Sequence, residues 1–373
     1  FRLSYCSIRF IHIFPFILHD MNDIKTTPIT NKYKNNQRDV DVKNSTLRTY
    51  DSIVFGGGGR RCVAHLGVIS ALEFYHDTNI GYKDKISNTT VSTLKLKHTV
   101  YKQFKFIGGI SGGCLFAISC AYGRNAKLVE RAIAKSDVLN ICDWSMISLR
   151  IGNGLMNPNV VESALRIFME DMQINPTTTT LGILEQSTNK KIGFLACNFD
   201  TGERITFTGL THPDVLVLDA MLASMCVPLL FPPKVINNVR YIDGAILDNV
   251  GRDMFMLNSK QTLCVSVGSY KPPPANMGWF ETVIRIGFFG DLNRNAETRY
   301  ENPNSKILDL SEFVNMIAFI PGVDEESDAL LKHQCIIQSF IETNKHFANP
   351  ICKDIYKCID VMIYVLISTH LYL

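Results

Sequence analysis

The sequence lacks an excess of charge of either sign. It has 38 lysines and arginines against 35 aspartates and glutamates, a net charge of +3 over 373 residues. Nucleic-acid-binding domains carry a concentrated basic surface, so we expect no nucleic-acid partner. The chain is not a disordered polyampholyte either, because 46% of its residues are hydrophobic and 20% are charged. That composition is typical of a chain that folds around a full core.

Metal-binding and disulfide patterns are also missing. The eleven cysteines are an odd number, and the sequence contains no CxxC pair and no His/Cys cluster with zinc spacing. Most cysteines lie inside apolar segments, such as Cys114 and Cys120 in GGCLFAISCAYG, as reduced and buried thiols do. We therefore expect no metal, no disulfide framework and an intracellular chain.

The two ends of the chain carry little that would build a core. Residues 1–18 are apolar but interrupted by charges and a proline, and no small-residue cleavage site follows them. Met21 is the first methionine, so this stretch is either translated upstream sequence or a fragment, or else a membrane-facing helix. Residues 22–50 are polar and read as a linker. We expect residues 1–50 to form a poorly ordered N-terminal extension.

The remaining chain divides into two predicted regions. We expect residues 51–270 to form the main α/β domain and residues 271–373 to form a mostly helical region packed on it. The run 262–268, TLCVSVG, is predicted to join the sheet of the first region. The final apolar run, 359–373, is too short to span a bilayer, which leaves a buried terminal element or a membrane-surface contact.

A glycine turn follows the first predicted strand. DSIVF (51–55) is a β-type run, four glycines follow it, and a helical pattern begins within CVAHLGVISALEFY. Backbone N–H groups at such a turn attract negative charge. The third glycine of a dinucleotide fingerprint and the Gly-Lys-Ser/Thr ending of a P-loop are both missing. The alternatives left are an oxyanion hole built from Gly57, Gly58 and Gly59 or a purely conformational turn.

A serine stands on a second strand-to-helix turn. The β-type run 104–110 leads into Ser111, which is flanked by Gly109 and Gly113, and the apolar helix 114–122 follows. GxSxG in this setting is typical of a nucleophile elbow, in which small neighbours permit the strained turn that exposes the hydroxyl. The plainer alternative is a Ser/Gly-rich loop that caps a helix.

A serine hydroxyl needs a base before it can attack, and aspartate is the better candidate here. Asp243 ends a β-type run and precedes the small residues Gly244 and Ala245, so a turn can place its carboxylate in the site as a general base. The downstream histidines, His212, His333, His346 and His370, occupy no convincing turn after a strand. A triad completed by His333 or His346 is the remaining enzyme alternative.

These motifs, in this order, resemble the patatin-like phospholipases over about 200 residues, from Ile53 to roughly Arg252. FGGGGRRCVAHLGVISAL resembles the family's oxyanion turn and first helix, and GISGG its nucleophile elbow. ACNFDTGERITFTG is similar to the strand pair before the aspartate. DAMLASMCVPLLFPPKVINNVRYIDGAILDN is similar to its Ala-Ser-Pro helix end, Phe-Pro-Pro turn and Asp-Gly-Ala motif. The resemblance implies a three-layer α/β fold with a mainly parallel central sheet flanked by helices.

The resemblance also implies an activity: lipid acyl hydrolysis of the phospholipase A or lysophospholipase type, with Ser111 as nucleophile, Asp243 as base and no cofactor. The sequence departs from the family pattern at Arg61, Leu222 and Gly251. These departures leave the donor register open among the three turn glycines. They also leave the alternative of a catalytically degenerate lipid-binding or regulatory protein.

A phospholipid or related lipid ester as substrate implies peripheral membrane association, and we expect the protein to be cytoplasmic. Arg60 and Arg61 stand beside the glycine turn, where they either contact a lipid phosphate or form a solvated pair. The candidate membrane surfaces are the apolar chain ends and the aromatic stretch 277–289. The oligomeric state does not follow from these residues.

Overall fold

A mixed eight-stranded sheet organises the part of the chain that the computed structural model describes, namely residues 50–73, 100–139, 157–255, 259–267, 305–310 and 325–347. Five strands run parallel, in the spatial order β3-β2-β1-β7-β8. β6 and β5 continue the sheet antiparallel beyond β3, and β4 pairs antiparallel with β3. The strands are β1 (Ser52–Phe55), β2 (Phe106–Ile110), β3 (Lys191–Asn198), β4 (Arg204–Phe207), β5 (Lys234–Ile236), β6 (Val239–Asp243), β7 (Thr262–Ser266) and β8 (Ser305–Asp309).

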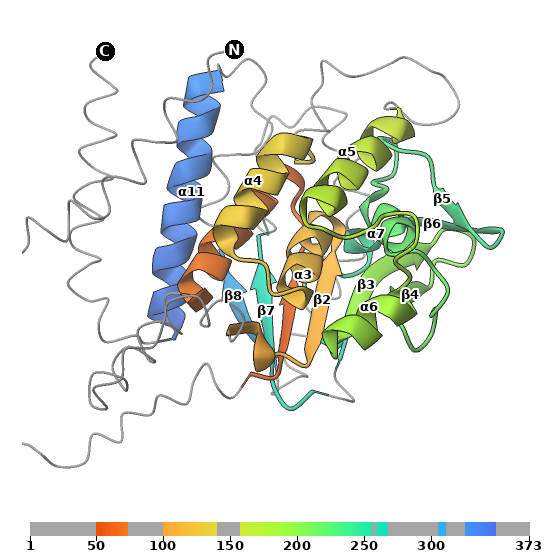
Figure 1. Cartoon of the computed structure of the whole chain (residues 1–373), viewed down its shortest axis with the longest axis horizontal. Coiled ribbons are helices and arrows are strands. Elements are labelled where there is room, and N and C mark those ends of the chain that lie inside the picture. Colours follow the sequence, from red (N-terminus) through yellow and green to blue (C-terminus); the bar gives the residue numbers. More distant parts are fainter. Residues whose placement is uncertain are drawn as a thin grey trace, which may run out of the picture. The chain divides into compact units, whose positions relative to one another are not determined.

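Helices connect the parallel strands and cover the sheet. Parallel neighbours need a crossover connection, and residues 64–73 supply a helical segment between β1 and β2. Figure 1 shows α3, α4 and α5 lying over one face of the sheet. The predicted α/β class, with a mainly parallel sheet flanked by helices, is therefore confirmed. The helices are α3 (Cys114–Ala121), α4 (Ala126–Ser136), α5 (Pro158–Asp171), α6 (Leu181–Thr188), α7 (Val217–Met225) and α11 (Glu325–His346).

Three of these helices begin at a side-chain cap that the sequence supplies. The Asn125 side chain accepts from the N–H of Leu128 at the start of α4, and Thr180 accepts from Ile183 at the start of α6. Asn157 caps α5, whose first residue is Pro158. These residues satisfy N–H groups that have no partner inside the helix, so local sequence fixes where each helix begins.

The short parallel strands are buried on both faces. All four residues of β1 and all five of β7 are buried, as expected for a parallel sheet covered on both sides. Ile53 and Phe55 belong to the large core beneath the helices, whereas Val54 points into a smaller cluster on the opposite face. In the described residues, Val250 and Phe255 pack into that second cluster. The segment that follows β6 thus covers the face opposite the helices.

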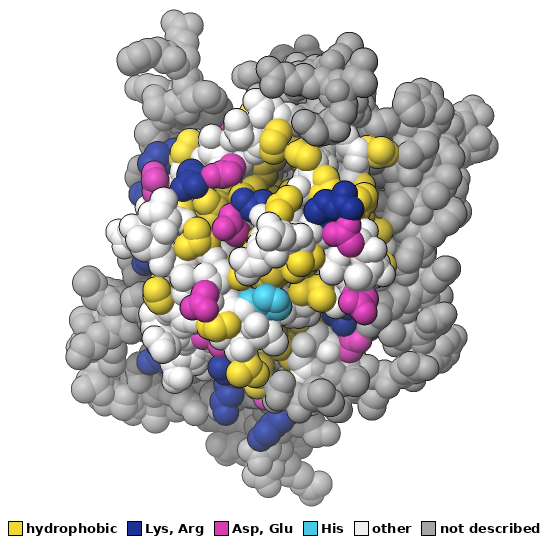
Figure 2. Space-filling model, turned by 90° about the vertical axis from the view of Figure 1, so that its right-hand side faces the viewer, with side chains coloured by type: hydrophobic (Ala, Val, Ile, Leu, Met, Phe, Trp, Pro, Cys, Tyr) yellow, Lys and Arg dark blue, Asp and Glu magenta, His cyan; other side chains and the backbone are white. Residues whose placement is uncertain are grey.

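The surface mixes residue types without a dominant charge. Figure 2 shows hydrophobic side chains exposed among acidic and basic ones on the side of the described part that carries β5. Phe199, Leu229 and Val235 are 46%, 48% and 57% exposed. Arg240 lies over the Phe199 ring, with its guanidinium carbon 4.9 Å from the ring centroid. This surface agrees with the near-zero net charge of the sequence.

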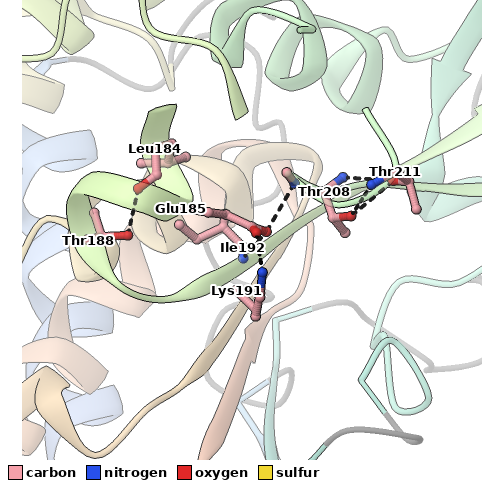
Figure 3. A network of polar contacts seen from close by, with 8 residues as sticks. Leu184, Glu185, Thr188, Lys191, Ile192, Thr208 and Thr211 are labelled. Atoms are coloured by element: carbon pink, nitrogen blue, oxygen red, sulfur yellow. Dashed lines mark hydrogen bonds and ion pairs between the residues drawn. The ribbon is translucent and has the colours of Figure 1, made fainter. Parts of the chain in front are cut away.

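A buried glutamate ties α6 to the sheet (Figure 3). Glu185 is 8% exposed, and Lys191 lies 2.8 Å from its Oε2. Its Oε1 accepts from the N–H groups of Ile192 at 3.2 Å and Gly209 at 3.0 Å. A buried carboxylate is tolerated only when its oxygens are paired. Glu185 therefore fixes helix α6 against β3 and against the turn that follows β4.

The C-terminal half of the chain contributes to this same sheet through β8, which pairs in parallel with β7. The sheet thus extends beyond residue 270, where the sequence pattern placed a helical region. The segment was missed because SKILD has only two apolar residues in a row, and pairing with β7 decides its conformation. The predicted run 262–268 does join the sheet as β7.

Helix α11 packs closely against the helix formed by residues 64–73. A Cβ atom at Gly67 would stand 2.2 Å from the carbonyl oxygen of Ile336 and 2.8 Å from the N of Phe340. Only glycine permits such an approach of two backbones. At the end of α11, the rings of His346 and Phe347 contact Tyr50.

Several predicted segments lie outside the described residues: 1–49, the aromatic stretch 277–289 and the terminal run 359–373. The division at residues 50 and 270 stays a prediction. Among the described residues, none of the helices combines the length and the hydropathy that crossing a bilayer requires.

Truncating a core aromatic tests this packing. Phe194 on β3 is fully buried in the core beneath the helices, so we expect Phe194→Ala to lower the free energy of unfolding by about 3–5 kcal/mol. Chemical denaturation followed by circular dichroism measures it. Leu210→Ala is the control, because Leu210 is 80% exposed and should change stability by about 0.5 kcal/mol or less. Equal effects of the two variants would contradict this packing.

Candidate active site

The two predicted turns lie side by side at the carboxyl edge of the sheet. β1 and β2 are parallel neighbours in register, with Phe55 opposite Gly109. The glycine turn leaves the end of β1 and Ser111 leaves the end of β2, so parallel pairing brings them together. The carboxyl edge of an open α/β sheet is where ligands bind in such folds.

Ser111 has a strained backbone that its glycine neighbours make possible. Its φ is 51°, in the left-handed region that side-chain-bearing residues rarely adopt. A Cβ at Gly109 would stand 2.6 Å from Cα of Cys114, and one at Gly113 would stand 2.1 Å from the carbonyl oxygen of Phe55. A larger residue at Gly109 would push β2 away from the start of α3, and one at Gly113 would push the turn away from β1. A strained serine between two closely packed glycines is what a nucleophile elbow requires.

Strand pairing brings Asp243 to Ser111 across 132 residues of sequence. β6 runs antiparallel to β3, with Asp243 opposite Ala196, and β3 pairs with β2. The Ser111 hydroxyl donates to Asp243 Oδ2 at 2.6 Å. The other oxygen, Oδ1, accepts from the N–H of Ala245 at 2.8 Å. Gly244 lies so close to β3 that a Cβ there would stand 2.4 Å from the carbonyl oxygen of Leu195.

Burial makes this carboxyl group a stronger proton acceptor than a surface aspartate. Asp243 is 1% exposed, and burial raises its pKa to about 7, although the hydrogen bonds from Ser111 and Ala245 partly oppose the shift. Burial also raises the pKa values of the nearby Cys62 and Cys114 thiols. These thiols stay neutral near neutral pH, so they place no negative charge beside Asp243. An aspartate with a pKa near 7 can take up and release a proton under physiological conditions.

Ser224 anchors the elbow from behind, a role that sequence reasoning did not assign. Its hydroxyl accepts from the backbone N–H of Ser111 at 2.9 Å and donates to the carbonyl oxygen of Leu195 at 2.6 Å. The Cys114 thiol also donates to it, at 3.3 Å. Ser224 is fully buried near the end of α7. A hydroxyl in the apolar run DAMLASM was the available signal, since buried polar groups need partners.

One of the three glycines predicted as oxyanion donors is already hydrogen-bonded inside the protein. The N–H of Gly57 donates to Asn249 Oδ1 at 2.8 Å, and Asn249 Nδ2 donates back to the Gly57 carbonyl oxygen at 3.0 Å. The Gly57 N–H, which the sequence predicted to be free for an oxyanion, therefore already has Asn249 as its acceptor. Among the described residues, no backbone carbonyl accepts from the Gly58 or Gly59 N–H groups, and the Gly58 N–H contacts the Cys62 sulfur and opposes the rise of its pKa. Gly59 also has a φ of 56°, which favours glycine.

Asn249 is the second residue that the motifs did not reveal as functional. It follows Asp243 in the segment GAILDN, where the family pattern has a proline two positions later and this chain has Gly251. Gly251 has a φ of 66° and its N–H donates to Asp248 Oδ1 at 2.7 Å. A proline could adopt neither feature. The substitution thus belongs to a local turn that still presents Asn249 to Gly57.

Leu222 and the two arginines make no hydrogen bond to Ser111 or Asp243 that is seen among the described residues. Leu222 is buried in the main core. Arg60 and Arg61 stand on the first turn after the glycines, each partly exposed. Desolvation lowers the pKa of Arg61, which remains a cation near neutral pH. Both are close enough in sequence to the turn to meet a ligand there.

The histidines provide no base for Ser111 among the described residues. The His212 ring bonds to Thr211, and the His346 ring bonds to the Tyr50 hydroxyl. The His333 side chain and His370 lie outside the described part. Fully buried His65 bonds through Nε2 to the carbonyl oxygen of Gly56 at 2.8 Å, and burial lowers its pKa to about 4. His65 is therefore neutral and donates to this carbonyl.

In the described part of the chain, no three His, Cys, Asp or Glu side chains converge as metal ligands would. The cysteines described there are free thiols.

Removing the buried charge tests the electrostatics of Asp243. Its raised pKa means that the stability it contributes is present below its usual value of 3.8 and is lost as pH rises through about 7. Asp243→Asn carries no such charge, so it does not lose this stability as pH rises. The free energy of unfolding of the variant, relative to that of wild type, should therefore increase by about 2 kcal/mol from pH 5 to pH 8. Urea denaturation at both pH values measures this. A difference that does not change with pH would contradict the buried carboxylate.

The chain aligns at 26% identity over 208 residues with "Probable lipid hydrolase 463L" of Invertebrate iridescent virus 6, covering 55% of this chain and 63% of the viral protein. The chain thus spans less than two thirds of that relative. The structure of VipD from Legionella pneumophila matches with a TM-score of 0.44 and 14% identity, over 80% of this chain and 67% of VipD.

The type III effector ExoU of Pseudomonas aeruginosa matches with a TM-score of 0.41 and 15% identity, over 80% of this chain and 53% of that chain. The family model described as patatin-like phospholipase matches residues 53–256, more than half of the chain. That span contains the glycine turn, Ser111 and Asp243. The chain belongs to the patatin-like phospholipase family.

Proposed function

We propose that the protein is a lipid acyl hydrolase that cleaves carboxylic esters with a Ser111–Asp243 dyad. The observation that carries the proposal is the 2.6 Å hydrogen bond from the Ser111 hydroxyl to Asp243 Oδ2, made by a serine with a φ of 51°. A strained serine and a buried carboxylate placed together form an arrangement that a structural turn does not require.

The reaction has two steps that use the same carboxylate. Asp243 takes the proton of Ser111 as Oγ bonds to the ester carbonyl carbon, and the carbonyl oxygen becomes an oxyanion. When the intermediate collapses, the C–O bond to the alcohol breaks and the alcohol leaves with the proton from Asp243. Water then attacks the acyl-enzyme, gives a proton to Asp243, and releases the fatty acid as Ser111 regains its proton.

The oxyanion needs hydrogen-bond donors that are already in place. We assign this role to the N–H groups of Gly58 and Gly59, because Gly57 donates to Asn249 instead. Gly59 also faces open space, since a Cβ there would meet no atom within 4 Å. The space beside Gly59 could therefore admit a substrate.

A phospholipid or a related lipid ester is the proposed substrate class. The family and the viral relative named as a lipid hydrolase support it. Arg60 or Arg61 would meet the phosphate of such a lipid, since guanidinium groups bind phosphate well. Peripheral contact with a membrane follows from such a substrate. The exposed Phe199, Leu229 and Val235 offer apolar surface for it in the described part.

Removing either dyad member tests the chemistry. Ser111→Ala and Asp243→Asn should each lower kcat on short-chain ester and phospholipid substrates by about 10³-fold or more, because nucleophile and base act as a unit. Release of fatty acid from a panel of phospholipids, lysophospholipids and triacylglycerols measures it, with circular dichroism as the check of folding. A folded variant with near-wild-type activity would contradict the proposed dyad. Failure of wild-type Ser111 to react with a fluorophosphonate would instead favour a degenerate lipid-binding protein.

The pH profile tests the assignment of Asp243 as the base. The ionised carboxylate is the form that accepts a proton, and its pKa is raised to about 7. We therefore expect kcat/KM to reach half its maximum near pH 7 and to fall about tenfold per pH unit well below it. The double variant His333→Ala/His346→Ala should keep the same profile. Loss of activity in that double variant, with the fold intact, would favour a histidine triad.

A further inference from the structure

We propose that Asn249 is a positioning residue that turns the Gly58 N–H toward the reacting ester oxygen. The inference rests on the proposed hydrolase function and concerns the orientation of the peptide between Gly57 and Gly58. Asn249 does not touch the reacting atoms in this scheme. It acts by holding the Gly57 backbone in one orientation.

The side chain of Asn249 grips both polar groups of Gly57. Its Oδ1 accepts from the Gly57 N–H at 2.8 Å, and its Nδ2 donates to the Gly57 carbonyl oxygen at 3.0 Å. Asn249 is 8% exposed, so little water competes for these bonds. The pair joins residues that are 192 positions apart in the sequence.

Gly57 lies directly between this carboxamide and the nucleophile. A Cβ on Gly57 would stand 2.7 Å from Asn249 Oδ1 and 2.7 Å from Cβ of Ser111. A shift of the Asn249 carboxamide would therefore move Gly57, which packs directly against Ser111. Glycine is required at this position by close packing on both sides.

The direction of the Gly58 N–H follows from peptide geometry. None of the described peptide bonds is cis, and in a planar trans peptide the carbonyl and the N–H point in opposite directions. Nδ2 holds the Gly57 carbonyl on the Asn249 side, so the Gly58 N–H of the same peptide points to the other side. A flipped peptide would offer a carbonyl oxygen in place of this donor.

The preceding peptide is held in the same way. His65 donates from Nε2 to the Gly56 carbonyl at 2.8 Å, and the N–H of that peptide is the Gly57 N–H bound by Asn249. Two successive peptides therefore have three of their four polar groups bound to His65 or Asn249. The fourth, the Gly58 N–H, faces the soft sulfur of Cys62, a weak acceptor that a developing oxyanion could replace. Glycine backbones have little conformational preference of their own, so these bonds set the orientation.

The same segment carries Asn249 and the proposed base. Asp243 and Asn249 lie on either side of the short turn Gly244–Ile246. Asp248 braces the backbone just after Asn249 by accepting from the N–H groups of Val250 at 3.1 Å and Gly251 at 2.7 Å. Arg204 on β4 lies 2.9 Å from Asp248 Oδ2. Base and oxyanion donor are thereby placed by one braced segment.

The two hydrogen bonds between Asn249 and Gly57 are called the clamp from here on. Asn249→Asp tests the clamp because it changes the chemistry of the side chain and leaves its shape almost the same. One oxygen can still accept from the Gly57 N–H, but the other now faces the Gly57 carbonyl oxygen and repels it. We expect the peptide to reorient and kcat to fall by about 10²- to 10³-fold, the loss typical of one oxyanion donor. KM and the affinity for a non-hydrolysable ether lipid should change less than threefold. The affinity for a lipid trifluoromethyl ketone, which forms an oxyanion on the serine, should fall in parallel with kcat.

Asn157→Asp is the matched control, because Asn157 is an exposed cap of α5 and the change is chemically the same. It should leave kcat and inhibitor affinity as in wild type. Asn249→Ala provides a second test if Asn249→Asp does not fold, since it removes the grip without adding charge. It should also lower kcat and ketone affinity together, by tenfold or more, at unchanged KM.

The outcomes separate this inference from the proposed function. An active wild type with Asn249 variants that keep kcat within threefold would overturn the clamp and leave the dyad standing. Parallel loss of ether-lipid and ketone affinity would also overturn it, because a clamp on the oxyanion donor does not affect binding without an oxyanion. A folded wild type that hydrolyses no ester of the panel would overturn the proposed function, and this inference with it.

Discussion

The hydrogen bond between Ser111 and Asp243 depends on the pairing order of the central sheet. β2 carries the serine, β6 carries the aspartate, and β3 lies between them as the common neighbour. β6 runs opposite to the parallel strands, yet its last residue reaches the edge at which β2 ends. The 2.6 Å contact therefore exists only while three strands keep their register, because a slip by one residue would turn Asp243 to the other face.

Burial of Ser111 and Asp243 lowers the stability of the fold, but it makes the carboxylate a better proton acceptor. A carboxylate that is 1% exposed is costly to ionise, and the raised pKa of Asp243 expresses that cost. The strained φ of Ser111 adds to it. The surrounding structure compensates by holding the backbone around the site with hydrogen bonds. Ser224 binds the Ser111 N–H and Ala245 binds the carboxylate. Such strain, together with a carboxylate poised near neutral pH, is characteristic of functional sites.

Side chains from distant segments position the backbone of the site. Ser224 comes from α7, Asn249 from the segment after β6, and His65 from the first helix. Each is a polar residue within a largely apolar stretch, and each satisfies a backbone group of a glycine-rich turn. Glycine gives these turns their close approach to neighbouring strands but no rigidity. The polar side chains supply that rigidity, so the turns and their anchors form one unit.

The sequence by itself determined the local parts of this protein. The strands before each turn, the glycines at Gly109 and Gly113, and the type and order of the motifs follow from short-range preferences of the backbone. Their resemblance to a family predicted the α/β sheet correctly. Only the tertiary structure decided that Gly57 is engaged by Asn249, that Ser224 supports the elbow, and that β8 extends the sheet beyond residue 270. These features depend on contacts between residues more than 100 positions apart or on pairing with a neighbouring strand, and short-range preferences carry no information about such contacts.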